Sequence, residues 1–155
     1  MTAILAVKSK GRVIVGSDRA VTCDNGQVLR CGPKVIWVGG FLVGLAGSIG
    51  GHWEALQEAT PATIRDVCQL LGPGPEAEAI AAQRGNLWLL SWEAGDGRWS
   101  ACEVDGPVAL GSGGLVALGA FLGAQGTTDR RIRRALELTA KHVGGVAGPF
   151  DVVTT

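Results

Sequence analysis

The chain has 155 residues, 46% of them hydrophobic, and 14 basic residues balance 14 acidic ones. This length predicts a single domain, residues 1–155, with room for a sizeable core. A neutral chain has no net field to attract nucleic acid or an anionic membrane surface, and its hydrophobic content argues against disorder. Twenty-five glycines without a repeating period indicate tight turns and close backbone contacts.

The first half of the chain predicts two β-hairpins followed by two helical segments. Short turns, 8–11 and Gly39-Gly40, join the apolar runs of each hairpin, and the runs are apolar enough for strands covered on both faces. Ser48 is the expected N-cap of the first helix, and Thr60-Pro61 opens the second, with Pro61 at its first position. The predicted strands are 3–7, 12–16, 35–38 and 41–45.

The second half predicts more strands, two helices and a closing strand. The first helix is apolar and rich in glycine, whereas the second places Ile132, Leu136, Thr139 and Val143 on one face. Four arginines lie largely off that face and indicate a solvated surface or a subunit contact. Such an order of elements favours antiparallel sheets stacked between helix layers. The strands are 79–83, 87–92, 99–104, 108–110 and 150–154, the helices 115–122 and 129–143, and the arginines 130, 131, 133 and 134.

Targeting and metal-binding signals are weak. The uncharged stretch 106–128 contains seven glycines, which makes a membrane span unfavourable, and the apolar run at the N-terminus is too short for a signal peptide. We therefore expect a cytoplasmic protein. The four cysteines, Cys23, Cys31, Cys68 and Cys102, form no C-x-x-C pair, so we expect small buried side chains and neither a metal nor a cofactor.

The second residue carries the first chemical signal. Thr2 follows the initiator methionine, which is commonly removed before so small a residue. Removal would place a hydroxyl and a free α-amine on one residue, so that a nucleophile and its proton acceptor are held together. The pKa of an α-amine is about 7.7–8.0, low enough for the amine to be partly neutral at physiological pH.

Five motifs then follow in a recognisable order. They are Thr2-Ala-Ile-Leu-Ala-Val, Gly16-Ser-Asp-Arg-Ala-Val-Thr, Gly32-Pro-Lys-Val, Val43-Gly-Leu-Ala-Gly-Ser and Leu110-Gly-Ser-Gly-Gly. Together they resemble the proteasome β-subunit family, and within it the bacterial HslV branch, over nearly the whole chain. Two departures are Ala3, where the family often carries a second Thr or Ser, and a segment from Lys34 to Gly44 that is about two residues short.

The resemblance implies a role for each matching residue. Thr2 would attack the scissile carbonyl and form an acyl-enzyme, Lys34 would stabilise the developing charge, and Asp18 would pair with Lys34. Ser112 would support the proton relay, and the backbone N–H of Gly44 would face the oxyanion. Substrate binding would involve Val21 and Thr22 beside Gly44, with an extended substrate added as a strand.

The resemblance also implies the fold and the assembly. The expected architecture is an α+β, four-layer α/β/β/α sandwich of the N-terminal nucleophile hydrolase type. The expected activity is that of a threonine endopeptidase acting on unfolded polypeptide inside a homo-oligomeric ring, in stacked hexamers or heptamers, with an AAA+ unfoldase ATPase as partner. The glycine-rich helix would contribute ring contacts. Two alternatives are a non-catalytic scaffold with the same fold and an N-terminal nucleophile amidohydrolase acting on a small amide.

Overall fold

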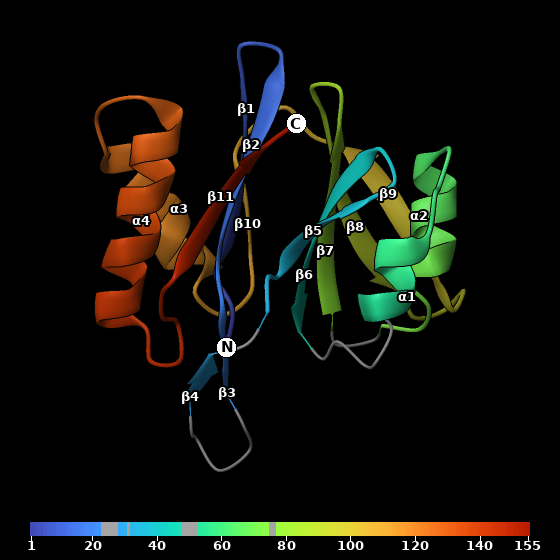
Figure 1. The fold of residues 1–155 in the computed structure, drawn as a ribbon, viewed down its shortest axis with the longest axis horizontal. Helices are drawn as coiled ribbons and strands as arrows, with labels where there is room; N and C mark the ends of the chain where they lie inside the picture. The colour runs from blue at the N-terminus through green and yellow to red at the C-terminus, as the bar shows by residue number, and fades with distance from the viewer. Residues whose placement is uncertain (23–27, 31, 48–52, 75–76) are drawn as a thin grey trace.

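The computed structural model describes residues 1–22, 28–30, 32–47, 53–74 and 77–155. Two antiparallel sheets lie face to face in the middle of the molecule (Figure 1). The first sheet has the order β10-β1-β2-β11, from β1 (Ile4–Ser9), β2 (Arg12–Asp18), β10 (Val108–Leu110) and β11 (Phe150–Thr154). The second has the order β5-β6-β7-β8-β9, from β5 (Val35–Val38), β6 (Phe41–Gly47), β7 (Ala77–Gln83), β8 (Asn86–Glu93) and β9 (Arg98–Glu103).

Helices cover the outer face of each sheet (Figure 1). The pair α3 (Gly114–Gly123) and α4 (Thr128–His142) packs on the first sheet, and the pair α1 (Trp53–Glu58) and α2 (Ile64–Leu70) packs on the second. A small hairpin of β3 (Ala20–Thr22) and β4 (Val28–Arg30) extends from the end of the first sheet where the chain begins. This arrangement confirms the predicted four-layer sandwich.

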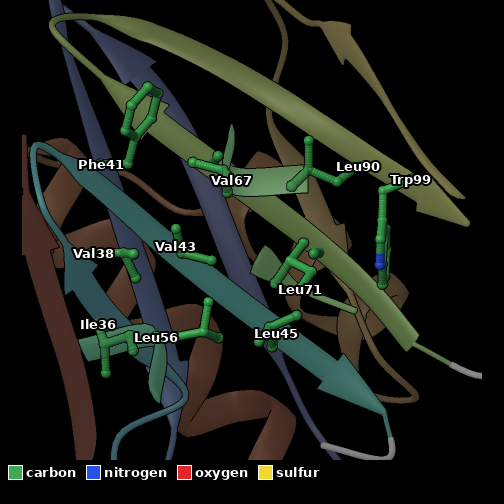
Figure 2. Close-up of a cluster of buried hydrophobic side chains, with 12 residues drawn as sticks. Ile36, Val38, Phe41, Val43, Leu45, Leu56, Val67, Leu71, Leu90 and Trp99 are labelled. Carbon is green, nitrogen blue, oxygen red and sulfur yellow. The ribbon is translucent and has the colours of Figure 1, made fainter. Parts of the chain in front are cut away.

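Alternation along the strands explains why they are apolar on both faces. In β2, Val13 and Val15 point into the core between the two sheets, whereas Ile14 points toward α3 and α4. The second sheet repeats the pattern, because its outer face packs against α1 and α2 (Figure 2). A strand between two apolar layers needs hydrophobic residues at successive positions, as the sequence predicted.

The structure corrects two expectations about local structure. The second helix begins at Ile64 rather than at Pro61, because Thr63 caps it: its hydroxyl accepts the N–H of Asp66, and the Asp66 carboxylate accepts the N–H of Thr63. These hydrogen bonds, the backbone bond from Thr63 foremost, lower the pKa of Asp66. The β3-β4 hairpin was not predicted, and Ser48 lies outside the described residues.

Side-chain environments add two further corrections. Cys102 is exposed on the edge strand β9, so the expectation of a buried thiol is wrong there. Cys68 is partly buried, which raises the pKa of its thiol, and Cys23 and Cys31 lie outside the described residues. Arg131 is not part of a purely solvated surface. Its guanidinium lies 4.1 Å from the Phe121 ring centroid and donates a hydrogen bond to the Phe121 carbonyl.

The other three arginines of α4, at positions 130, 133 and 134, are exposed. The opposite face of α4 buries Ile132, Leu136 and Thr139 as the sequence predicted. None of the helices in the described ranges is both long and apolar enough to cross a membrane.

Candidate active site

Sheet topology brings the start of β1 next to the ends of its two neighbours. β1 lies between β10 and β2 and is antiparallel to both, with Ile4 paired to Leu110 on one side and Ser17 on the other. Because antiparallel strands run in opposite directions, β10 and β2 end where β1 begins. Thr2 therefore lies between Asp18, the last residue of β2, and the turn that follows Leu110.

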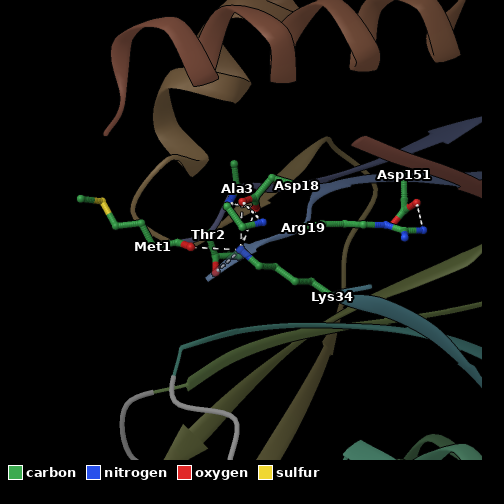
Figure 3. A network of polar contacts seen from close by, with 8 residues as sticks. Met1, Thr2, Ala3, Asp18, Arg19, Lys34 and Asp151 are labelled. Atoms are coloured by element: carbon green, nitrogen blue, oxygen red, sulfur yellow. Dashed lines mark hydrogen bonds and ion pairs between the residues drawn. The ribbon is translucent and has the colours of Figure 1, made fainter. Parts of the chain in front are cut away.

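Lys34 reaches this point from the other sheet. It lies immediately before β5, where its carbonyl accepts the N–H of Leu45 at 3.1 Å. Its ammonium Nζ donates to the Thr2 hydroxyl Oγ1 at 3.0 Å and to both carboxylate oxygens of Asp18 at 2.9 and 3.0 Å (Figure 3). A further bond, of 3.0 Å, runs to the carbonyl of Met1. The structure thus brings together three residues that the sequence analysis selected.

The ion pair between Lys34 and Asp18 is buried, so each residue depends on the other. Asp18 is fully buried and Lys34 is 4% exposed. An isolated charge so deep would cost far more than its packing returns, so each charge needs the other and further hydrogen bonds. Asp18 obtains these from the backbone N–H groups of Ala3 at 2.9 Å and Ala20 at 3.1 Å. Each carboxylate oxygen of Asp18 is therefore held by a backbone N–H as well as by Lys34.

The turn after β10 fixes the main chain of Thr2. The N–H of Gly113 donates to the Thr2 carbonyl at 2.9 Å. Gly111 has φ +79°, and a Cβ there would approach the Thr2 carbonyl oxygen to 2.5 Å. Only glycine allows both the left-handed backbone and this close approach. The predicted Ser112 lies between these glycines and is exposed.

The remaining predicted residues lie at two places. Gly44 is inside β6, between Val35 of β5 and Ile80 of β7, where an added Cβ would meet the Ile80 side chain at 3.0 Å. Its backbone N–H therefore lies in the plane of the sheet, and its role as an oxyanion donor stays a prediction. Val21 is 40% exposed in β3, and Thr22 in the same strand pairs with Val28.

Two contacts near Thr2 were not anticipated. Arg19 forms a two-pronged ion pair with Asp151 of β11, at 2.7 and 2.6 Å (Figure 3), which ties the last strand to the residue after Asp18. The carboxylate of Glu78, on β7, accepts the N–H of Gly111 at 2.8 Å. Neither pair has a sequence signal, because both depend on how distant segments pack.

The geometry suits an attacking hydroxyl. A lysine ammonium has only donors, so its bond to Oγ1 uses an oxygen lone pair and leaves the hydroxyl proton free to move to a base. The positive charge also favours negative charge developing on that oxygen. Among the described residues no cluster of three His, Cys, Asp or Glu side chains is placed to bind a metal ion.

Comparison with solved structures identifies the fold. The chain superposes on Thiobacillus denitrificans BPH, solved in complex with epoxomicin, with a TM-score of 0.77 at 16% identity, covering 99% of this chain and 98% of that one. It superposes on HslV from Trypanosoma brucei with a TM-score of 0.67 at 22% identity, with the same coverage of the two chains. Four layers in this order are those of the N-terminal nucleophile hydrolase fold.

Comparison with curated sequences identifies the family. The chain is 30% identical to the ATP-dependent protease subunit HslV of Sulfurihydrogenibium sp. (strain YO3AOP1), over 94% of this chain and 89% of that protein. It is also 30% identical to the subunit of the same name from Aquifex aeolicus (strain VF5), over 90% and 87%. No protein-family model matches the sequence. The chain belongs to the HslV family.

Proposed function

We propose that the protein is a threonine endopeptidase whose nucleophile is Thr2, exposed as the first residue after Met1 is removed. One observation carries the proposal: the Lys34 ammonium lies 3.0 Å from the Thr2 hydroxyl while it is paired with the buried Asp18. This contact places a positive charge beside the oxygen that would attack the substrate. The family membership supports the same activity, because its curated relatives are named as protease subunits.

The proposed reaction uses the α-amine of Thr2 as the base. This amine takes the hydroxyl proton while Oγ1 bonds to the carbonyl carbon of the substrate. The amine then gives the proton to the leaving nitrogen as the C–N bond breaks, which leaves an ester on Thr2. Water, deprotonated by the same amine, attacks the ester carbon. The amine then returns the proton to Oγ1 as the ester bond breaks, which releases the carboxylic acid product and restores the free threonine. Lys34 stabilises the negative charge that develops on Oγ1 as the hydroxyl proton leaves, and again as the ester bond breaks.

Removal of Met1 is a requirement of this mechanism. While Met1 is attached, the Thr2 nitrogen belongs to an amide and does not accept a proton. Met1 is 51% exposed, whereas Thr2 is 9% exposed, so the bond to be cut lies at the boundary between solvent and the site.

The surroundings of Thr2 support an extended peptide substrate. In the part of the chain that the structure describes, β3 pairs with β4 alone, which leaves its other edge open to a further strand. Val21 is exposed on β3 and offers an apolar contact. Substrate would then bind by strand addition near Val21 and Thr22, with Ser112 assisting the proton relay and Gly44 proposed as the oxyanion donor.

We also propose a ring-shaped homo-oligomer served by an ATPase that delivers unfolded chains. The names of the curated relatives, ATP-dependent protease subunits, support the ATPase. The surface of α3 supports the ring, because Leu115 and Leu122 are 84% and 62% exposed on an outer helix. Contiguous exposed apolar side chains commonly mark subunit contacts.

Two variants of the first residue test the proposal. Thr2→Ala keeps a second residue small enough for Met1 removal but lacks the hydroxyl. The variant is therefore expected to lose hydrolysis of a fluorogenic peptide while remaining assembled. Thr2→Ser retains both reacting groups and is expected to keep measurable turnover. Mass spectrometry of each protein establishes where its chain begins. Full activity in Thr2→Ala, or in a preparation that retains Met1, would exclude this mechanism.

The same assay separates the alternatives. A non-catalytic scaffold would show no peptide turnover even with a free Thr2 amine. An amidohydrolase would hydrolyse a small amide faster than the fluorogenic peptide, with both activities lost in Thr2→Ala. The cross-sheet Lys34–Thr2 contact supports catalysis, because it places a positive charge beside the hydroxyl that would attack.

A further inference from the structure

Glu78 forms the second connection between the two sheets near Thr2. It lies near the start of β7, paired with Ala46 of β6, and its side chain leaves the second sheet to reach the turn after β10. There its carboxylate oxygen Oε2 accepts the N–H of Gly111 at 2.8 Å. Glu78 is an exposed residue, so the bond lies at the rim of the site rather than in the core.

The turn that Glu78 holds is in direct contact with the nucleophile. Gly111 packs so closely on Thr2 that an added Cβ would come within 2.9 Å of the Thr2 Cβ. Gly113 donates its N–H to the Thr2 carbonyl at 2.9 Å, and Gly114 donates to the Gly111 carbonyl at 2.8 Å. The hydrogen bond from Gly114 to Gly111 joins the two ends of the turn, so residues 111–114 move together and the Thr2 main chain moves with them.

Lys34 and Glu78 therefore act on Thr2 from the same sheet in different ways. Lys34 contacts the side chain of Thr2 directly, whereas Glu78 reaches its main chain through the turn. The distance from Oγ1 to the lysine ammonium depends on both connections, because the turn and Lys34 belong to opposite sheets. Loss of the Glu78 bond would free the turn to move away from the second sheet while Lys34 stays paired with Asp18.

We infer that Glu78 is a positioning residue, whose hydrogen bond to Gly111 sets the place of Thr2 relative to Lys34. This inference rests on the proposed function. The acceptor matters more than the charge, since the partner is an uncharged backbone N–H. A glutamine keeps an oxygen of the same reach and can accept the same bond.

The test compares Glu78→Ala with Glu78→Gln in the assembled, full-length protein after Met1 removal. Because misplacement of a reacting group by about 1 Å can cost about a hundredfold in rate, we expect Glu78→Ala, a smaller disturbance, to lower kcat about tenfold. KM should change by less than about twofold, because the loss concerns the reacting hydroxyl and not substrate binding. Glu78→Gln should recover most of kcat. Glu137→Ala, an exposed glutamate on α4, serves as the matched control and should leave kcat unchanged.

Three results would overturn the inference. Unchanged kcat in Glu78→Ala would show that the turn needs no connection to the second sheet. Equal losses in the Ala and Gln variants would show that the charge, not the hydrogen bond, is required. A rise in KM confined to substrates with basic side chains would make Glu78 a substrate contact instead. Thr2→Ala, measured in parallel, keeps the two proposals apart, because its continued activity would refute the nucleophile whatever Glu78 does.

Discussion

Two buried regions of this protein are held together by different forces. The Thr2 site consists of three polar residues, Thr2, Asp18 and Lys34, each at most 9% exposed and joined by bonds of about 3 Å between named atoms. The outer core consists of the apolar side chains between the second sheet and α1 and α2 (Figure 2). Its members are Ile36, Val38, Phe41, Val43, Leu45, Leu56, Val67, Leu71, Ala79, Ala81, Leu90 and Trp99.

The two regions differ in whether their contacts are directional and in how many neighbours share each contribution. In the outer core each side chain contributes through many weak contacts, so the loss of one is spread over its neighbours. The Thr2 site depends on a few directed hydrogen bonds, so removal of one residue leaves a buried charge or hydroxyl with fewer partners than it needs. We therefore expect substitutions in the outer core to change stability more than turnover, and substitutions in the Thr2 site to change turnover first.

The largest effect is expected from Lys34→Ala. It removes the cation from Oγ1 and leaves the Asp18 carboxylate buried with only the N–H groups of Ala3 and Ala20. Breaking a buried pair typically costs about 3–5 kcal/mol, and peptide hydrolysis should fall below detection. Denaturant unfolding and a peptide assay measure the two effects. Normal kcat in a folded Lys34→Ala protein would contradict the role assigned to the lysine.

A smaller effect of the opposite kind is expected from Leu90→Ala. Leu90 is 1% exposed in β8, within the outer core. Truncation of a buried leucine costs about 2–5 kcal/mol through lost burial and the cavity it leaves. Turnover per folded molecule should stay within about twofold of the parent, because no bond of the Thr2 site is touched. Urea unfolding gives the stability change. A large fall in kcat without a loss of stability would contradict the proposed difference between the two regions.

The smallest effect is expected at the cap of α2. Thr63→Ala removes one half of the capping box, and loss of such an N-cap costs about 1 kcal/mol. The pKa of Asp66 is lowered first by the backbone N–H of Thr63, which the substitution keeps, and second by the Thr63 side chain, which it removes. The stabilisation due to that side chain exists above the unfolded pKa of Asp66 and is lost as pH falls through the folded value. The stability difference between Thr63→Ala and the parent should therefore shrink in acid. Urea titrations at pH 7 and pH 3 measure it, and a difference that grows in acid would contradict the capping geometry.

Most of the architecture could be predicted because it follows from long patterns. The apolar runs of β1, β2, β5 and β6 and the periodic face of α4 have unambiguous spacing. The hairpin β3-β4 was missed because each strand has three residues, too few for any periodicity. The start of α2 was misplaced because Pro61 is a familiar first residue, whereas the capping box at Thr63 determines the true beginning.

The Thr2 site divides in the same way. Thr2, Asp18 and Lys34 were selected because their motifs resemble those of the proteasome β-subunit family, and the strand order brings the three residues together. Glu78 and the Arg19–Asp151 pair were missed because their partners lie 33 and 132 residues away along the chain. Contacts at such separations depend on sheet packing and on turn geometry, which no local pattern records.

The direction of the strands has a practical consequence for making this protein. β11 runs antiparallel to β2, so Phe150 lies beside Asp18 while Thr154 lies beside Ile14, near the far end of the first sheet (Figure 1). An affinity tag fused after Thr155 would project away from the Thr2 hydroxyl. Under the proposed mechanism, the same tag fused ahead of Thr2 would convert the amine that acts as the base into an amide. Purification through the C-terminus is therefore the choice that leaves the chemistry open to measurement.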